Sequence, residues 1–227
     1  MLELVTSNLE KAGWDLALAS SPRSWRNKVL APETASSSVK VVNRPIAQAN
    51  IVIGTPGLVG SDERRYAMAI LNTVLGGGMS SRLFQEIREK RGLAYSVYSF
   101  NQGYSDGAAF GLYAGCSPAK TKEVTKLMLE ELEKIANQGI TMDELNLAKG
   151  NISGGLALKF ESTQARMSRL SSAELTDGEF TDLDEALARF DSVSLEDVKQ
   201  VARAMAKAEH SFVAVGDLSE DLFDEFR

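Results

Sequence analysis

The start of the chain shows helical periodicity and then loses it. Three apolar residues lie about one helical turn apart: Leu2, Val5 and Leu9. Because Gly13 follows them, we expect a short helix over residues 1–13. Residues 20–38 hold two of the five prolines and six serines, a composition typical of a linker. We therefore interpret residues 1–38 as the tail of a preceding domain with its linker, and residues 39–227 as the compact domain.

Apolar runs with strand character recur in this compact domain. VKVV at 39–42 and AQANIVIGTP at 47–56 predict two strands. Residues 93–116 predict a long β-hairpin, in which Ser105-Asp106-Gly107 supplies the small residues that a tight turn requires. HSFVAVGDL at 210–218 predicts the last strand.

Helix signals flank a run of three glycines. Before this run, Ser61 is expected to cap a helix whose first turn carries two acids, where they suit the positive end of the helix dipole. The glycines that end this helix are Gly76, Gly77 and Gly78. After them, Ser80 or Ser81 is expected to cap a second helix over residues 81–91, which Gly92 ends.

Helical spacing dominates the second half of the chain. A helix is expected over residues 117–137, and a capping box of Thr141 and Glu144 opens a long helical stretch that breaks at Gly154-Gly155. The two shorter helices that follow span residues 181–190 and 194–207. The order of strands, helices, hairpin, helices and strand is not a regular β-α-β alternation. It predicts an α+β fold, a two-layer sandwich in which helices pack on one face of a mostly antiparallel sheet.

Composition and charge narrow the classes of function. The chain carries 25 Lys and Arg against 31 Asp and Glu, a net charge of −6, which argues against binding of a nucleic-acid backbone. No apolar run approaches the ~18 residues that a membrane span needs. The first residues hold no apolar core of a secretory signal, so the cytoplasm is the default expectation.

The histidine and cysteine counts exclude several kinds of active site. His210 is the single histidine and Cys116 the single cysteine, so neither a zinc site built on several histidines nor a cysteine-rich one can form within the chain. A serine-histidine-aspartate triad would have to use His210, which precedes a predicted strand and is expected to be structural. We expect that this chain holds no complete active site and binds no metal.

The glycine-rich segment GGGMSSR at 76–82 is the first candidate for chemistry. A glycine-rich loop that leads into a helix can bind a phosphate group. The Gly-Lys-Ser/Thr ending of such loops is missing, however, and no parallel strand precedes the segment. We therefore expect Gly76–Gly78 to form a structural bend between two helices, with phosphate binding as the weaker alternative.

A second candidate joins Arg88 to Tyr95. Arg88 lies near the end of a predicted helix, Gly92 stops that helix, and Tyr95 opens the next strand. Such a corner can bring a guanidinium and a phenol together, and both groups donate hydrogen bonds. Together they could hold a peptide carbonyl or the oxyanion formed on it. The alternative is a solvated arginine at a helix end and a tyrosine packed on a sheet.

The segment LNTVLGGGMSSRLFQEIREKRGLAYSVYSF at 71–100 resembles the pitrilysin/insulinase family of zinc metallopeptidases, and within it the bacterial relatives of the mitochondrial processing peptidase. RPIAQANIVIGTPG at 44–57 is similar to the opening strand of that family, and FGLYAGCSPAKTKEV at 110–124 to its returning strand and helix. Weaker similarity continues through the later helices, so the resemblance covers about residues 39–218.

The resemblance implies roles for the candidate residues. Members of this family carry two homologous domains, of which the first holds the zinc motif H-x-x-E-H. The second lacks the metal and contributes an arginine and a tyrosine, seven residues apart, to the closed site. These positions match Arg88 and Tyr95, which are then expected to be catalytic and substrate-binding. The chain resembles the second domain alone, so residues 39–227 would be the C-terminal, substrate-closing half.

The resemblance implies that this chain is one of the two halves of an enzyme. The full-length protein would be a zinc metalloendopeptidase that hydrolyses peptides, with zinc held by an N-terminal partner domain, and the isolated chain would be inactive. The expected partners are that zinc-binding domain and a peptide substrate; a homodimer is also compatible with the sequence. The alternative is a non-catalytic scaffold or partner subunit of the same family.

Overall fold

The computed structural model describes four stretches of the chain, which are residues 1–14, 38–104, 107–173 and 181–226. The chain separates into two compact units, Met1–Leu30 and Ala31–Arg227. Most of the predicted linker lies outside the described residues. Among the helices that the described residues form, none is long and apolar enough to cross a membrane.

The first unit contains helix α1, Leu2–Lys11. Gly13 adopts a positive φ of 81°, the left-handed conformation that suits glycine after a helix. The prediction of a helix over residues 1–13 is therefore confirmed. No residue of α1 is buried, and five large apolar side chains of this unit are exposed: Met1, Leu2, Leu4, Val5 and Trp14.

The second unit is built on a five-stranded sheet. Its strands are β1 (Val39–Asn43), β2 (Ala49–Pro56), β3 (Ala94–Gly103), β4 (Ala108–Cys116) and β5 (Ser211–Gly216). The spatial order is β1-β5-β2-β4-β3, and only the pair of β1 and β5 runs parallel. The predicted hairpin is confirmed as β3 and β4, although Ser105 and Asp106 of its turn lie outside the described residues.

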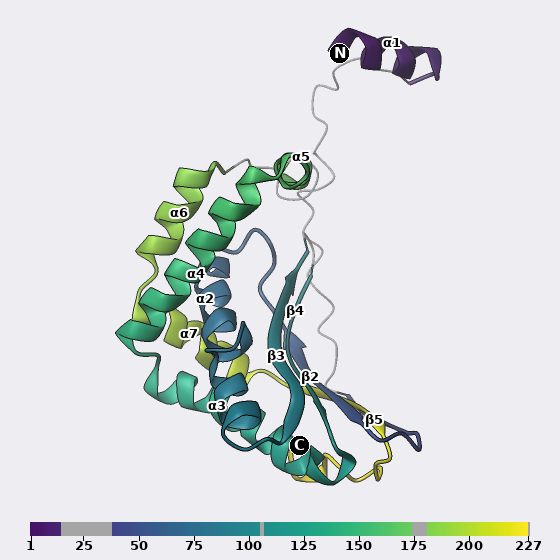
Figure 1. Ribbon diagram of the computed structural model, residues 1–227, viewed down its shortest axis with the longest axis vertical. Coiled ribbons are helices and arrows are strands. Elements are labelled where there is room, and N and C mark those ends of the chain that lie inside the picture. The colour runs from purple at the N-terminus through teal and green to yellow at the C-terminus, as the bar shows by residue number, and fades with distance from the viewer. Residues whose placement is uncertain (15–37, 105–106, 174–180, 227) are drawn as a thin grey trace. The chain divides into compact units, whose positions relative to one another are not determined.

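Helices cover one face of this sheet (Figure 1). The described helices of this unit are α2 (Arg65–Gly76), the π-helix η1 (Phe84–Glu89), the short 3₁₀-helix η2 (Pro118–Lys120), α3 (Thr121–Gln138), α4 (Met142–Glu161), α5 (Thr163–Ser172), α6 (Leu183–Ser192), α7 (Leu195–Lys207) and the 3₁₀-helix η4 (Asp224–Phe226). Of these, α2, η1 and α3 contact the sheet directly, whereas α5 packs on α4. α2 packs against β3 and α7, and α3 packs against α7. The predicted two-layer α+β sandwich is confirmed.

The core lies between the sheet and this helical layer. Strand β2 shows the origin of the arrangement, because its alternate residues Ala49, Ile51 and Ile53 are at most 1% exposed while the residues between them are half-buried. The helices contribute fully buried side chains such as Met68, Leu71 and Met128. Burying each large aliphatic side chain stabilises the fold by about 1.5–3 kcal/mol.

The first predicted helix start is wrong. α2 begins at Arg65 with Arg64 as its N-cap, and Ser61 makes no cap. The carboxylate of Asp62 instead accepts hydrogen bonds from the backbone N–H of Arg64 at 2.8 Å and from its guanidinium at 2.7 and 3.0 Å. A local turn closed by an aspartate side chain has displaced the expected cap.

Two further helix predictions are corrected. Residues 84–89 form a π-helix rather than an α-helix, and Ser81 donates its hydroxyl to the Gly78 carbonyl at 2.6 Å instead of capping. α4 does not break at Gly154-Gly155 but continues for 20 residues to Glu161. Each glycine weakens a helix by about 1 kcal/mol, which is too little to stop one that already has a capping box and several turns.

The end of α2 provides a stability prediction. A Cβ added at Gly76 would lie 2.0 Å from the backbone nitrogen of Ser99 in β3, whereas one added at Gly78 would meet nothing within 4 Å. We expect Gly76→Ala to lower the free energy of unfolding by about 3 kcal/mol through overpacking against backbone. Gly78→Ala, the matched control, should stay within about 1 kcal/mol of wild type. Thermal unfolding measures both, and equal melting temperatures would contradict the proposed close approach.

Candidate functional site

The three glycines lie where the chain leaves α2. Gly76 packs on β3, and a Cβ at Gly77 would lie 2.6 Å from the Cα of Thr73. The N–H of Gly77 donates to the Thr73 carbonyl at 3.2 Å, and the N–H of Ser81 donates to the Gly78 carbonyl at 3.1 Å. Since these two amides are already bonded within the chain, the geometry favours a structural bend over phosphate binding.

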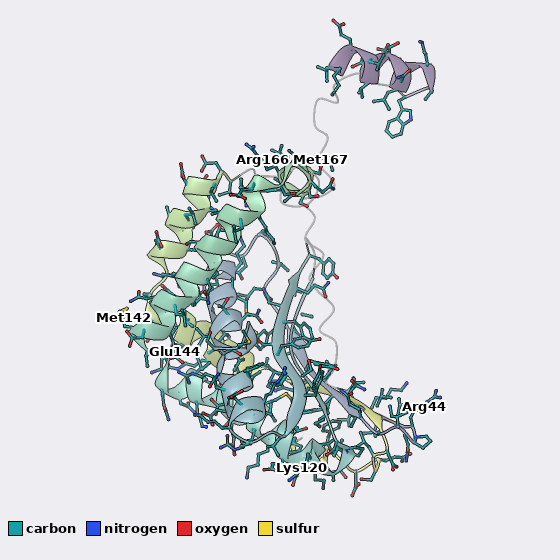
Figure 2. All side chains as sticks on the ribbon, viewed as in Figure 1. Arg44, Lys120, Met142, Glu144, Arg166 and Met167 are labelled. Atoms are coloured by element: carbon teal, nitrogen blue, oxygen red, sulfur yellow. The ribbon has the colours of Figure 1, made fainter. Side chains whose placement is uncertain are left out.

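Arg82 ties the segment after the bend to the start of α4. Its Nε lies 2.7 Å from Oε1 of Glu144, and its Nη2 lies 2.8 Å from Oε2, a two-point ion pair. Its Nη2 also donates to the Gly139 carbonyl at 3.3 Å. Glu144 lies in the first turn of α4, where it closes the predicted capping box by accepting from the N–H of Thr141 at 2.8 Å (Figure 2).

This pair shifts the ionisation of both partners. The hydrogen bonds from Arg82 hold the pKa of the Glu144 carboxyl below its usual range, and those from Glu144 raise the pKa of Arg82. Both side chains are largely buried, with 20% and 28% of their surfaces exposed. The charge pair therefore holds the segment more firmly than an ordinary surface ion pair would.

The π-helix η1 forms a tight corner between the bend and β3. Leu83 and Ile87 are fully buried and anchor the corner in the core. The wide turn is closed by the N–H of Lys90, which donates to the Gln85 carbonyl at 3.0 Å, five residues back. Gly92 then reverses the chain with a φ of +61°, which confirms its predicted role as the helix stop.

The corner brings Arg88 and Tyr95 together. The guanidinium carbon of Arg88 lies 5.2 Å from the centre of the Tyr95 ring and 4.9 Å from the centre of the Phe84 ring. Both distances suit cation–π contact. Tyr95 is 77% exposed and lies at an irregularity of β3, between Ala94 and Ser96, where the pairing with β4 slips. The pair is thus adjacent and open to solvent.

Within the described part of the chain, the Arg88 guanidinium donates no hydrogen bond. It forms no ion pair with any carboxylate among the described residues. The nearby carboxylate of Glu86 is engaged by Lys90 and by Arg91, the latter at 2.7 Å, and these bonds lower the pKa of Glu86. A cation with unused donors beside an exposed phenol can bind a carbonyl oxygen or an oxyanion.

The residues that the structure describes do not fit a zinc site. Within the described ranges, no group of three or more His, Cys, Asp and Glu side chains could hold a metal ion. Cys116 is buried in β4, and burial raises the pKa of its thiol to about 11. His210 precedes β5, and burial lowers its pKa. These two residues supply the chain's single thiol and single imidazole.

The sequence predicts Arg88 and Tyr95 as site residues, and the structure places them in contact. The sequence does not predict what holds them there. The π-helix, the slip in β3 pairing and the contact with Phe84 have no signature that separates them from an ordinary helix and strand. Arg82 and Glu144 are 62 residues apart. The capping box draws attention to Glu144 and the glycine run to Arg82, but no feature of the local sequence predicts that the two side chains pair.

Comparison with known proteins identifies the family. The family model described as "Peptidase M16 inactive domain" matches residues 2–152, and the chain belongs to this family. The resemblance predicted from residues 71–100 is thereby confirmed.

Curated relatives agree with this assignment. The chain is 46% identical to an uncharacterized zinc protease of Streptomyces coelicolor over 88% of its own length and 43% of that protein. It is 40% identical to an uncharacterized zinc protease of Mycobacterium tuberculosis, over 80% and 41% of the two chains. The chain therefore spans less than half the length of these relatives.

Solved structures share the fold. The crystal structure of a peptidase M16 inactive domain from Pseudomonas fluorescens superposes with a TM-score of 0.72 at 23% identity, covering 80% of this chain and 44% of that one. A protease from Helicobacter pylori gives a TM-score of 0.74 at 23% identity, covering 81% and 45%.

The Arg82–Glu144 pair gives a pH-dependent prediction. Because the folded state lowers the pKa of Glu144, the pair stabilises the fold above the ordinary carboxyl range and loses this contribution as pH falls through the lowered value. We expect Glu144→Gln to cost about 1–2 kcal/mol at pH 7, and the difference from wild type to shrink below about pH 4.

Denaturant unfolding at several pH values measures this effect. Glu123→Gln is the matched control, because Glu123 pairs with Lys120 on an exposed surface, with about half of each side chain accessible. A Glu144→Gln effect that is the same at pH 3 and pH 7, or no larger than that of the control, would contradict a stabilising charge pair.

Proposed function

We propose that this chain is the metal-free, substrate-closing half of a zinc metalloendopeptidase, and that Arg88 and Tyr95 contact the peptide. The observation that carries the proposal is the exposed pairing of the two side chains, 5.2 Å from guanidinium carbon to ring centre, with the guanidinium donors free of ion pairs among the described residues. Membership of the peptidase M16 inactive-domain family supports it.

The two side chains suit complementary tasks. Arg88 carries a planar, permanently charged guanidinium that can donate two parallel hydrogen bonds, and Tyr95 carries one hydroxyl donor. A peptide carbonyl that is attacked by water develops negative charge on its oxygen, and donors already in place stabilise that charge without reorganising. The contacts of Arg88 with the Phe84 and Tyr95 rings and the buried anchors Leu83 and Ile87 hold these donors in position.

The zinc would be supplied from outside this chain. The Streptomyces and Mycobacterium relatives are named zinc proteases, and the residues of this chain do not fit a zinc site. In our proposal the metal therefore belongs to an N-terminal domain of the longer protein, where it supplies the activated water. The part of this chain is to bind the peptide and to hold its carbonyl oxygen.

The second candidate function is a non-catalytic scaffold or partner subunit. The family description calls this domain inactive. A chain of complex III₂ from Candida albicans shares the fold, with a TM-score of 0.70 at 19% identity. In that case the Arg88 and Tyr95 side chains would have no effect on any turnover.

Turnover by a longer protein that contains this chain separates the two candidates. We expect Arg88→Ala and Tyr95→Phe each to lower kcat about 10²-fold, because each removes a donor to the developing oxyanion. Arg91→Ala and Tyr104→Phe are matched controls, since Arg91 is engaged by Glu86 and Tyr104 lies exposed at the far end of β3. Wild-type turnover in both test variants would favour the scaffold.

The isolated chain gives a simpler measurement. Purified without added chelator and analysed by plasma mass spectrometry, it should contain much less than one zinc per chain, because it lacks the ligands for a structural or catalytic site. Stoichiometric zinc that survives dialysis would contradict the placement of the metal in another domain.

A further inference from the structure

The face of the sheet that points away from the helices carries an ordered row of side chains. Strand register places five residues side by side across all five strands, which are Tyr98 (β3), Tyr113 (β4), Val52 (β2), Val213 (β5) and Lys40 (β1). Their neighbours along each strand, such as Ile51 and Ile53, point into the core. The helices of the second unit lie on the opposite face (Figure 1).

The aromatic side chains at one end of this row are held in place by ring stacking and a hydrogen bond. The rings of Tyr98 and Tyr113 stack with centres 4.7 Å apart and an angle of 28° between planes. The Tyr113 hydroxyl donates to Oδ1 of Asn50 at 2.8 Å, and desolvation raises the pKa of Tyr113. Beside the row, the Phe100 ring lies over Gly111, where an added Cβ would come within 2.3 Å of it. The aromatic surface is therefore fixed before any ligand arrives.

This row remains open to solvent. Tyr98 is 42% exposed and Val213 is 37% exposed. Exposed aromatic and branched aliphatic side chains in register form a continuous apolar strip, which is a feature of binding surfaces more than of inert ones.

Charge distinguishes the strip from the rest of the molecule. The chain as a whole carries −6, yet none of its five described strands contains an Asp or Glu. Lys40 is the single charged residue in these strands and ends the row at β1. Arg44 directly follows the last residue of β1 (Figure 2). The face is thus apolar at its β3 side and positive at its β1 side.

We propose that this face binds an extended peptide segment that carries aromatic or branched aliphatic side chains followed by a carboxylate. The four strand spacings of the row, at about 4.8 Å each, span about 19 Å, the length of roughly six extended residues. The apolar side chains would lie on Tyr98, Tyr113 and Val52, and the carboxylate would reach Lys40. This proposal rests on the proposed function, because it takes the ligand of the sheet face to be a peptide. It adds the class of peptide that the face would bind.

Charge complementarity favours this occupant over a second copy of the chain. A second sheet face would bring another acid-free surface with its own Lys40 and would leave both cations without a partner. An apolar peptide with an acidic end supplies the missing charge, and its aromatic side chains can stack on the exposed tyrosines.

Binding of two labelled peptides to the isolated 227-residue chain tests the proposal. Both carry two phenylalanines and two valines with a neutral dye; one ends in two aspartates and the other in two lysines. By fluorescence anisotropy at low salt, we expect the aspartate peptide to bind about tenfold more tightly. Tyr98→Ser should weaken its binding about tenfold, and Lys40→Glu should reverse the preference between the peptides.

Matched variants on the helical layer provide the controls. Leu158→Ser removes an apolar side chain that is 70% exposed on α4, and Lys122→Glu reverses an exposed charge on α3. Both should bind like wild type. Binding here is measured on the isolated chain and turnover on a longer protein, so a failure of the catalytic proposal, seen in turnover, is distinguishable from a failure of this one.

Three results would overturn the proposal. The first is equal affinity for the two peptides, and the second is unchanged binding by both Tyr98→Ser and Lys40→Glu. The third is a chain that binds neither peptide, forms a dimer in sedimentation velocity, and becomes a monomer on Tyr98→Ser. The last would assign the face to a second copy. Circular dichroism checks that each variant folds. If Tyr98→Ser does not fold, Lys40→Glu, which changes only a surface residue, still tests the proposal.

Discussion

The close approach of the end of α2 to strand β3 is the constraint on which the corner that carries Arg88 and Tyr95 depends. At Gly76 the two backbones come so near that no side chain fits between the helix and Ser99. The chain must therefore turn within the next few residues, and it does so over an exposed Gly78 before Leu83 enters the core. The π-helix follows this turn and leads into β3 at Ala94.

A second restraint comes from charge. The two-point pair of Arg82 and Glu144 joins the segment after the bend to the capping box of α4. Backbone contact on one side and an ion pair on the other leave the corner little freedom, so Arg88 and Tyr95 face solvent from a rigid base. Rigid placement matters for chemistry, because donors that need not reorganise stabilise a developing charge most effectively. The chain thus offers positioned donors, and its described residues hold no group of side chains that could bind a metal ion.

The sequence predicted those helices and strands whose geometry depends on neighbouring residues. The alternation in β2 and the capping box of Thr141 and Glu144 gave correct elements, because pleat and cap geometry are set by neighbouring residues. The π-helix was missed because its wide turn, flanked by the buried Leu83 and holding the buried Ile87, has no signature in the local sequence. The pairing of Arg82 with Glu144 spans 62 residues and has no local signature. Chemistry alone left Arg88 and Tyr95 undecided, and family resemblance selected them.

The central claim is that the corner built by these restraints presents Arg88 and Tyr95 to the oxygen of the peptide bond that is cleaved. A crystal structure of a longer protein that contains this chain, with a peptide phosphonate bound as a tetrahedral mimic, tests it most directly. The account predicts that the Arg88 guanidinium and the Tyr95 hydroxyl each lie within about 3.2 Å of a phosphonate oxygen. A bound phosphonate that both side chains leave untouched would contradict it.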